Sequence, residues 1–227
     1  MKKINNYIAV IPCRKGSKRI KNKNTKKFKG KELYKYTIEQ CLRLFVKKNI
    51  IITTDDEKII SYCKSSKINY IKRSKFLSAG KVTSMEILYD IIQKIKPNIQ
   101  NYIYLQVTSP LRRDNDILSS TRQFENRKCD CLISVTDAFT NPLWCNSIKK
   151  GSMYNFISKK ISLTQSQKLP KLHQINGSIY ITKKKFIKKN NSFYQIKNSI
   201  PFYMNKKNSI DIDDHQDWDI AEKLYNN

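Results

Sequence analysis

The first half of the chain alternates short apolar runs with segments of helical periodicity, and this alternation constrains the fold more than any other feature. Residues 7–12 and 50–54 are nearly continuous apolar runs of strand length, whereas residues 34–45 carry apolar side chains at helical spacing. Alternation of this kind predicts a parallel sheet covered by helices on both faces. The expected fold class is therefore α/β with a mostly parallel sheet.

The alternation continues along the chain with recognisable helix boundaries. Thr83 and Glu86 form the pattern of a capping box at the start of a helix, which we expect Pro97 to stop. Acidic residues 55–57 similarly open a helix. Further strands are expected at residues 102–106, 131–135, 177–181 and 209–213, and further helices at residues 114–127 and around Trp218, Ala221 and Leu224.

One segment interrupts this regularity. Residues 137–175 are rich in Lys, Ser and Gln, with scattered large side chains such as Trp144 and Met153. Long excursions in compact domains are usually lids, binding loops or oligomer contacts. A chain of 227 residues can bury one sizeable core, and no internal repeat or linker is evident. We expect a single domain, residues 1–227, from which residues 137–175 form an irregular excursion.

The formal net charge of +27 is compatible with two classes of function. A nucleic-acid-binding protein would be strongly basic, and this alternative rests on charge alone. The lysines, however, are spread over nearly every expected element, with short runs such as Lys183–Lys185 and no long basic arm. We expect such a field to attract small anionic ligands, and we do not expect a nucleic-acid partner.

Composition also indicates a cytoplasmic protein without membrane insertion. No apolar run approaches the roughly 20 residues that a membrane-spanning helix needs. The apolar stretch after the basic N-terminus is too short for a secretory signal. The six cysteines lie mainly inside apolar patterns and none forms a CxxC pair, which argues against disulfides and structural zinc.

A basic loop follows the first expected strand and is suited to phosphate. In open parallel sheets, ligands bind outside the carboxyl ends of the strands. Arg14–Arg19 supplies several cations, together with Gly16 for close backbone approach and Ser17 as a neutral donor, and the basic character continues to Lys23 and Asn24. The loop matches neither the GxGxxG nor the GxxxxGK[ST] pattern, and a solvated basic loop is the alternative interpretation.

An acidic pair lies near the other end of the chain. Asp211 and Asp213 alternate with apolar residues, and residues two apart on a strand point to the same face. Two convergent carboxylates beside a phosphate site suit Mg²⁺, which proteins usually hold with one or two carboxylates plus substrate oxygens and water. A solvent-facing acidic edge is the alternative.

Two further stretches offer neutral polar groups. Residues 105–112 end a strand with an amide, hydroxyls and a proline-stiffened turn, a supply of donors and acceptors that fits a polyhydroxylated ligand. Asn176 and Gly177 precede another expected strand, where a simple turn is an equally good interpretation.

In order and approximate spacing, four stretches resemble the acylneuraminate cytidylyltransferases, also called CMP-sialic acid synthetases. They are residues 11–24, 105–112, 176–181 and 211–213. The resemblance covers nearly the whole chain. It implies a Rossmann-like nucleotidyltransferase fold, a Mg²⁺ requirement, and CMP transfer from CTP to a nine-carbon acidic sugar. It also implies a homodimer in which the excursion contacts the partner and closes the sugar site.

The resemblance assigns roles by position. Nucleotide contacts are expected from Arg14, Gly16, Ser17, Lys18, Lys23, Asn24 and Arg73. Sugar contacts are expected from Ser84, Gln106, Thr108, Gln174 and Asn176. Catalytic roles are expected for Arg14, Lys18, Lys23, Asp211 and Asp213, the last two as Mg²⁺ ligands.

One departure from the family pattern concerns the sugar. Many members have an arginine two residues before the Asn-Gly pair, a natural partner for the sugar carboxylate, and this chain has Gln174 there. The substrate is therefore open among sialic, legionaminic and pseudaminic acid types, and the eight-carbon acid Kdo or another sugar remains the alternative. His173 and His215 lie in no matched motif, so no general base is assigned.

Overall fold

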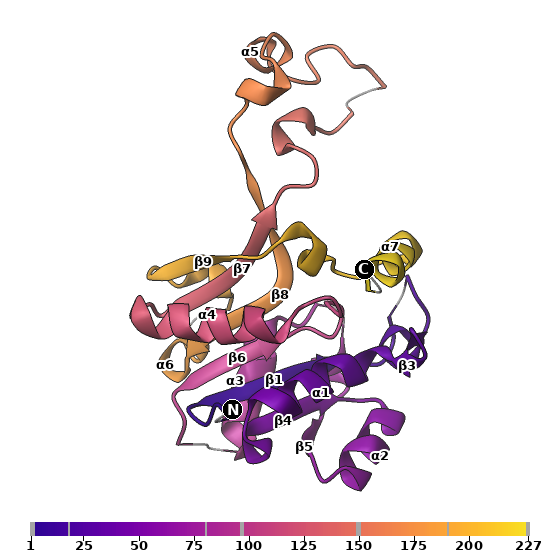
Figure 1. Ribbon diagram of the computed structural model, residues 1–227, viewed down its shortest axis with the longest axis vertical. Coiled ribbons are helices and arrows are strands. Elements are labelled where there is room, and N and C mark those ends of the chain that lie inside the picture. Colours follow the sequence, from indigo (N-terminus) through magenta and orange to yellow (C-terminus); the bar gives the residue numbers. More distant parts are fainter. Residues whose placement is uncertain are drawn as a thin grey trace.

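The structure is a computed structural model that describes residues 3–17, 19–79, 81–95, 98–148, 151–189 and 191–225. Its main feature is a seven-stranded sheet in the order β5-β4-β1-β6-β8-β7-β9 (Figure 1). The strands are β1 (Tyr7–Cys13), β4 (Ile50–Thr54), β5 (Asn69–Lys72), β6 (Asn101–Leu105), β7 (Cys131–Asp137), β8 (His173–Lys183) and β9 (Ser199–Tyr203). A short hairpin of β2 (Lys27–Phe28) and β3 (Lys31–Glu32) forms a second sheet.

Most strand pairs in the main sheet are parallel, as the sequence predicts. β1 pairs in parallel with both β4 and β6, and β7 pairs in parallel with β9, whereas β8 runs antiparallel to β6 and β7. The helices are α1 (Leu33–Leu44), α2 (Glu57–Ser65), α3 (Ser84–Ile95), α4 (Asp114–Asn126), α5 (Lys159–Ser162), α6 (Lys184–Ile187) and α7 (His215–Tyr225).

The central strands are buried on both faces, which explains why they form continuous apolar runs in the sequence. On β1, Ala9 and Ile11 belong to one core cluster and Ile8 and Val10 to another. The first cluster also contains buried side chains of α1, α2, α4 and α7, and the second contains those of α3 and α6. The expectation of helices on both faces of the sheet is confirmed.

The expected strand at residues 209–213 is wrong. Residues Lys206–Ser209 form a 3₁₀ helix, η7, and residues 210–213 pair with no described strand. One backbone hydrogen bond, from Ile212 N to Thr108 O at 2.8 Å, attaches this extended segment to the turn after β6. The apolar alternation remains, because Ile210 and Ile212 are buried while Asp211 and Asp213 are partly exposed.

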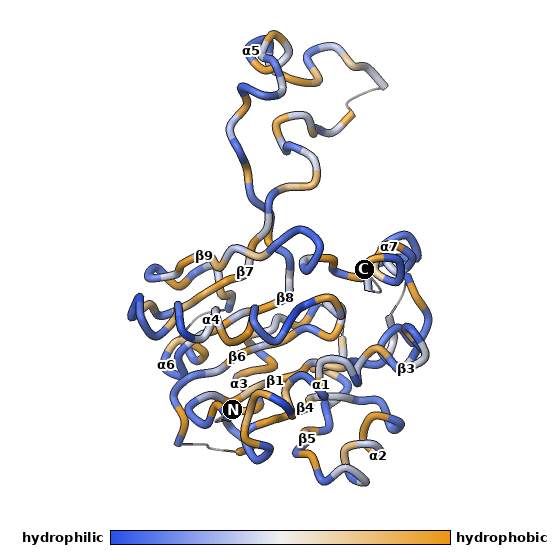
Figure 2. The backbone as a smooth tube through the Cα atoms, in the orientation of Figure 1, coloured by the Kyte–Doolittle hydropathy of each residue, from blue (hydrophilic) through white to orange (hydrophobic). Residues whose placement is uncertain are grey.

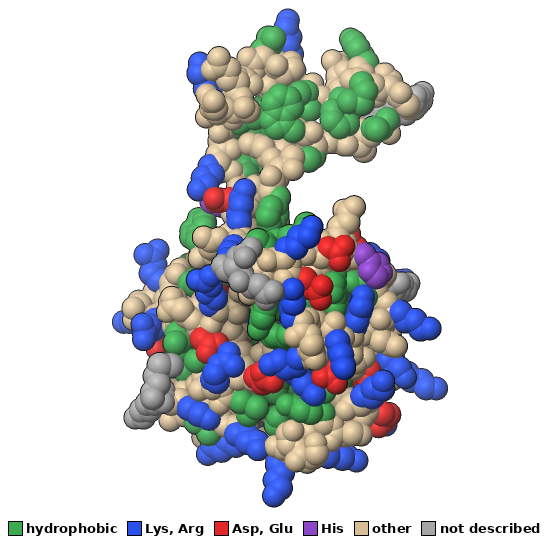
Figure 3. Space-filling model, turned by 45° about the vertical axis from the view of Figure 1, so that its right-hand side comes forward, with side chains coloured by type: hydrophobic (Ala, Val, Ile, Leu, Met, Phe, Trp, Pro, Cys, Tyr) green, Lys and Arg blue, Asp and Glu red, His purple; other side chains and the backbone are tan. Residues whose placement is uncertain are grey.

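The expected excursion corresponds largely to an arm that projects from the ends of β7 and β8 (Figure 1). A hydrogen bond from Ala138 N to Leu172 O at 2.9 Å closes its base. β8 begins at His173, so the last residues of the range 137–175 belong to the sheet. Apolar positions recur along the arm (Figure 2) and its hydrophobic side chains are visible at the surface (Figure 3). Within the described ranges, no helix has the length and hydropathy to cross a membrane.

Candidate active site

A cavity of about 410 Å³ lies beside the carboxyl ends of β1 and β6. Its wall includes the loop after β1, the turn after β6 and the segment before α7, so it is built from both ends of the chain. Predicted site residues that line it are Arg14, Ser17, Lys23, Asn24, Arg73, Ser84, Gln106, Thr108 and Asp213. The N-terminal cations and a C-terminal carboxylate therefore share one cavity, although their roles stay predictions.

The loop after β1 is anchored by hydrogen bonds to its backbone. Lys15 N donates to Asp55 Oδ1 at 2.6 Å, and Asn24 Nδ2 donates to Arg14 O at 2.9 Å. Gly16 has a φ of +81°, which glycine adopts without the cost that other residues incur. The anchored loop leaves the side chains of Arg14 and Ser17 at the cavity. Lys18, predicted to contact the triphosphate, lies outside the described residues.

Lys23 connects the two ends of the chain. It opens the short 3₁₀ helix η1 (Lys23–Thr25), and its buried ammonium donates to Ile212 O. The same Nζ lies 3.5 Å from Asp213 Oδ1. Asp213 also pairs with Arg19, whose Nη2 lies 2.9 Å from Oδ2. Arg19 was assigned no role from the sequence, although its place in the basic run 14–19 was a usable signal.

Asp211 is not among the residues that line the cavity, and its carboxylate lies largely buried beside Gly177. Its Oδ1 is buried without a hydrogen-bond partner. A Cβ added to Gly177 would lie 3.0 Å from Asp211 Oδ2, which is closer than an ordinary contact, so a larger residue would require the carboxylate to shift. Burial raises the pKa of Asp211 to about 6, and the negative charge of Asp213 acts in the same direction, while a hydrogen bond with Thr108 opposes both.

Asp211 and Asp213 are a donor set that fits Mg²⁺. Asp211 Oδ1 is a buried oxygen that lacks a partner, and Asp213 reaches the cavity wall. Proteins commonly hold Mg²⁺ with one or two carboxylates while substrate phosphates and water complete the octahedron. The described residues contain no cluster of three or more His, Cys, Asp or Glu side chains that could hold a metal ion.

The predicted sugar residues divide into two groups. Ser84, Gln106 and Thr108 line the cavity, where Thr108 Oγ1 donates to Gln106 Oε1 at 3.3 Å. Asn176 is buried outside the lining and its Nδ2 donates to Ser209 Oγ at 2.9 Å. Gln174 lies at the base of the arm, where its Oε1 accepts from Phe139 N at 3.2 Å. The structure does not bring these last two to the cavity of the same chain.

Arg73 presents an unsatisfied donor at the cavity. Its Nε donates to Thr53 Oγ1 at 3.0 Å, but its Nη2 is buried with no partner. A buried donor without an acceptor is costly, so an acceptor on a bound ligand would be stabilised there. Beside Arg73, the cavity has an apolar wall that sequence reasoning missed, which consists of Leu77, Ala79, Val82, Ile87 and Tyr104.

Neither histidine lies in the cavity lining. His173 Nδ1 is 3.2 Å from Asp137 Oδ1 at the base of the arm, and His215 is the exposed first residue of α7.

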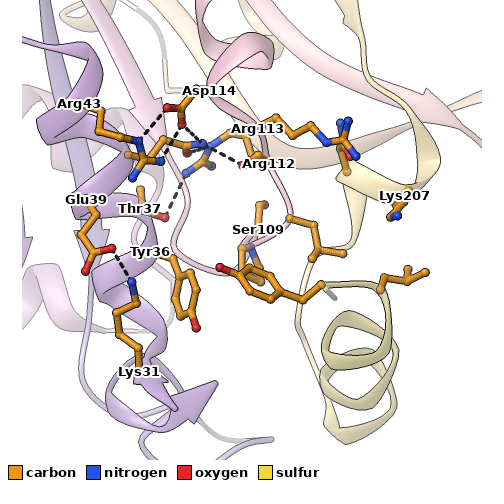
Figure 4. Close-up of a pocket in the computed structure, with 16 residues that line it drawn as sticks. Lys31, Tyr36, Thr37, Glu39, Arg43, Ser109, Arg112, Arg113, Asp114 and Lys207 are labelled. Carbon is orange, nitrogen blue, oxygen red and sulfur yellow. Dashed lines mark hydrogen bonds and ion pairs between the residues drawn. The ribbon is translucent and has the colours of Figure 1, made fainter. Parts of the chain in front are cut away.

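A second cavity of about 430 Å³ is lined by residues of α1, of the turn after β6 and of α7 (Figure 4). Residues 106–108 of this turn line the first cavity, whereas Ser109 to Asp114 line the second. Its acidic groups are already paired, Asp114 with Arg43 and Glu39 with Lys31. None of the predicted site residues lines it.

Comparisons with known proteins agree with the geometry. A family model described as cytidylyltransferase matches residues 8–226. A Campylobacter coli protein, post-translational flagellin modification protein B, is 31% identical over 96% of this chain and 94% of its own. The CMP-N,N'-diacetyllegionaminic acid synthase of Legionella pneumophila is also 31% identical, over 96% of this chain and 95% of its own.

Other relatives are longer proteins. The N-acylneuraminate cytidylyltransferase of Escherichia coli is 29% identical over 94% of this chain, which spans about half (51%) of that relative's length. Among solved structures, CMP:2-keto-3-deoxy-manno-octonic acid synthetase complexed with CTP superposes with a TM-score of 0.70 over 97% of this chain and 98% of its own, at 15% identity. This likeness concerns the fold, which is the Rossmann-like nucleotidyltransferase fold that the resemblance implies. Because the family model covers almost every residue, the chain belongs to the cytidylyltransferase family.

Proposed function

We propose that this protein transfers CMP from CTP to the anomeric hydroxyl of a nine-carbon acidic sugar and releases pyrophosphate. The observation that carries the proposal is the shared cavity, in which cations that follow β1 face the carboxylate segment that precedes α7. The names of the relatives support a substrate of the sialic, legionaminic or pseudaminic acid type. The proposed place of the reaction is the cytoplasm.

The residues of the cavity suit an in-line displacement at the α-phosphorus. Arg14 and Lys23 stabilise negative charge on the polyphosphate, a role that we extend to Lys18 by position. The contact of Lys23 with Ile212 O fixes its ammonium before substrate arrives. Asp211 and Asp213 would hold Mg²⁺, which when bound offsets charge on the phosphates and the leaving pyrophosphate. Arg73 supplies a free donor for the nucleotide.

Sugar recognition is proposed to involve both the chain and a partner. Ser84, Gln106 and Thr108 offer hydroxyl and amide groups at the cavity. Gln174 and Asn176 do not line this cavity. In our proposal, Gln174 at the base of the arm contributes to the sugar site of the partner subunit rather than to that of its own chain.

The arm is proposed to mediate a homodimer and to close the sugar site of the partner. Its exposed apolar side chains include Ile148, Tyr154 and Leu163, with exposed fractions of 65%, 86% and 76%. A projection of this kind cannot bury these side chains against its own body (Figure 3). Exposed apolar surface of this extent is typical of an interaction site.

A substrate panel tests the proposed reaction. Wild-type protein is supplied with CTP, Mg²⁺ and single candidate sugars, namely nine-carbon acids of the three types and the eight-carbon Kdo, and pyrophosphate is measured. We expect release with at least one nine-carbon acid and none without sugar. Release with Kdo alone, or with no acid at all, would contradict the proposal. A parallel titration with labelled RNA at physiological salt tests the nucleic-acid alternative, since adventitious lysine binding fades with salt.

A further inference from the structure

Arg112 is a buried arginine at the boundary between the two cavities. It lies in the turn after β6 with 4% of its surface exposed, and it lines the second cavity rather than the first (Figure 4). Sequence reasoning noted it at the end of a family-like stretch and gave it no role.

The guanidinium makes four hydrogen bonds. Its Nε donates to Gln40 Oε1 at 2.9 Å and its Nη2 to Thr37 Oγ1 at 3.0 Å, so one side of the group is fixed to α1. Its Nη1 donates to two backbone carbonyls, Gln106 O at 3.0 Å and Ser178 O at 2.9 Å. The other side of the group therefore joins the residues that follow β6 to β8.

All four acceptors are neutral, although Asp114 lies nearby. The carboxylate of Asp114 is engaged by Arg43 and by Gln40. Burial without a directly paired carboxylate lowers the pKa of Arg112 to about 10. A buried charge of this kind is costly unless its hydrogen bonds compensate, and a neutral residue at this place would avoid the cost.

The two carbonyls mark the place where β6 and β8 separate. The antiparallel ladder between these strands ends at the pair Leu105 and Ile179. Gln106 directly follows β6 and Ser178 directly precedes Ile179 on β8, and Nη1 of Arg112 bridges their carbonyls where no ladder pairing continues. The guanidinium therefore extends the connection between the strands beyond the last ladder pair.

Both bridged residues support groups at the proposed active site. The side chain of Gln106 lines the first cavity and accepts from Thr108. Ser178 follows Gly177, whose missing Cβ makes room for Asp211 Oδ2. A shift between β6 and β8 at this level would move Gln106 relative to Asp211.

We propose that Arg112 is a positioning residue for nucleotidyl transfer, which fixes Gln106 and the Gly177–Asp211 contact relative to each other without touching substrate. The inference rests on the proposed function. A misplacement of about 1 Å can reduce a rate by up to 100-fold, so the effect of losing the bridge should be large.

The test compares Arg112→Lys and Arg112→Gln with Arg43→Lys. We expect kcat to fall on the order of 10- to 100-fold in the Arg112 variants, with little change in KM for CTP because the loop after β1 is anchored independently. Arg112→Lys should restore only part of kcat, because lysine lacks the planar guanidinium that reaches the two carbonyls and α1 at the same time. Arg43 lines the same cavity and pairs with Asp114, but makes no bond to Gln106 or Ser178, so its variant should keep wild-type kcat.

Hydrogen exchange provides a readout that does not depend on activity. Peptides covering residues 105–109 and 176–179 should exchange faster in the Arg112 variants and at the wild-type rate in Arg43→Lys. If wild-type protein releases no pyrophosphate with any sugar, the proposed function fails, while this measurement still decides the inference. Unchanged exchange would overturn it. So would a wild-type kcat in folded Arg112 variants, even with a lower melting temperature.

If the Arg112 variants do not fold, Thr37→Val removes one acceptor of the guanidinium, together with the longer bond from Thr37 Oγ1 to Gln106 O at 3.5 Å, and keeps the branched shape. We then expect a smaller fall in kcat and faster exchange in the same two peptides. Wild-type values of both would overturn the inference.

Discussion

At the residue scale, Asp211 is the group whose protonation should govern activity. Its pKa of about 6 in the folded protein lies above the ordinary value of 3.8. As the pH falls through about 6, the carboxylate that would bind Mg²⁺ becomes neutral. We therefore expect pyrophosphate release at sub-saturating Mg²⁺ to decline with an apparent pKa near 6 on the acidic side, because Mg²⁺ and the proton compete for this carboxylate. A pH–rate profile of kcat/KM checks this, and a limb that remains flat down to pH 5 would contradict it.

The same carboxylate should lower stability at neutral pH. A group whose pKa is raised by folding favours the folded state more when protonated, so stability increases as the pH falls from above 6 towards 4. Asp211→Asn removes the buried charge and should stabilise the protein by on the order of 1–3 kcal/mol at pH 8, with loss of activity. Urea unfolding at pH 8 and pH 4 measures this, and the difference from wild type should largely vanish at pH 4.

Two glycines with positive φ offer a matched comparison. Gly177→Ala would place a Cβ 3.0 Å from Asp211 Oδ2 at a φ of +70°, whereas Gly30→Ala, at +83° between β2 and β3 and outside the cavity lining, meets no atom within 4 Å. Strain alone costs roughly 1 kcal/mol or more, so both variants should lose stability. Only Gly177→Ala should also displace Asp211 and so abolish most activity. Equal activity losses in both, after correction for unfolded protein, would contradict the steric argument.

At the scale of elements, Asn176 attaches β8 to the segment that carries the two aspartates. Its amide accepts from Ser134 Oγ at 2.5 Å and donates to Ser209 Oγ at 2.9 Å. Asn176→Ala would leave buried hydroxyls without this partner, and we expect a loss of roughly 1–3 kcal/mol in unfolding free energy. Thermal and urea unfolding measure the loss. A direct sugar contact instead predicts a raised KM for the sugar in a protein of unchanged stability.

The elements that periodicity could identify were those buried on both faces or amphipathic. β1, β4 and the helices of the first half follow from apolar runs and helical spacing, because burial alone decides their composition. The expected strand at 209–213 failed because Ile210 and Ile212 pack into the core without strand pairing. β9 was missed, since its exposed residues and Pro201 give a weak strand pattern, and the antiparallel direction of β8 depends on long-range pairing.

The site was predictable to the extent that its groups come directly after strands. The loop after β1 and the turn after β6 meet at one edge of the sheet, so the nearness of Arg14, Gln106 and Thr108 follows from topology. The hidden position of Asn176 and the pairing of Arg19 with Asp213 depend on side-chain directions that no local pattern specifies.

At the scale of the whole molecule, the exposed apolar side chains of the arm predict a homodimer. We expect a dimer of twice 26.8 kDa by light scattering. Tyr154→Glu combined with Leu163→Glu should give a monomer, because each charge would enter an apolar interface. Ile220→Glu is the control, since Ile220 is also exposed (46%) but lies on α7. A wild-type monomer, or an unaffected dimer in the double variant, would refute the role of the arm.

The ion pairs of Asp213 with Lys23 and Arg19 join residues that are separated by about 190 positions of sequence. During synthesis, the basic loop leaves the ribosome long before its acidic counterpart exists. A nascent chain that ends before residue 211 would therefore hold a cluster of cations with no carboxylate opposite. Chemistry at this cavity becomes available only after residues 211–213 have been translated and have folded against the basic loop.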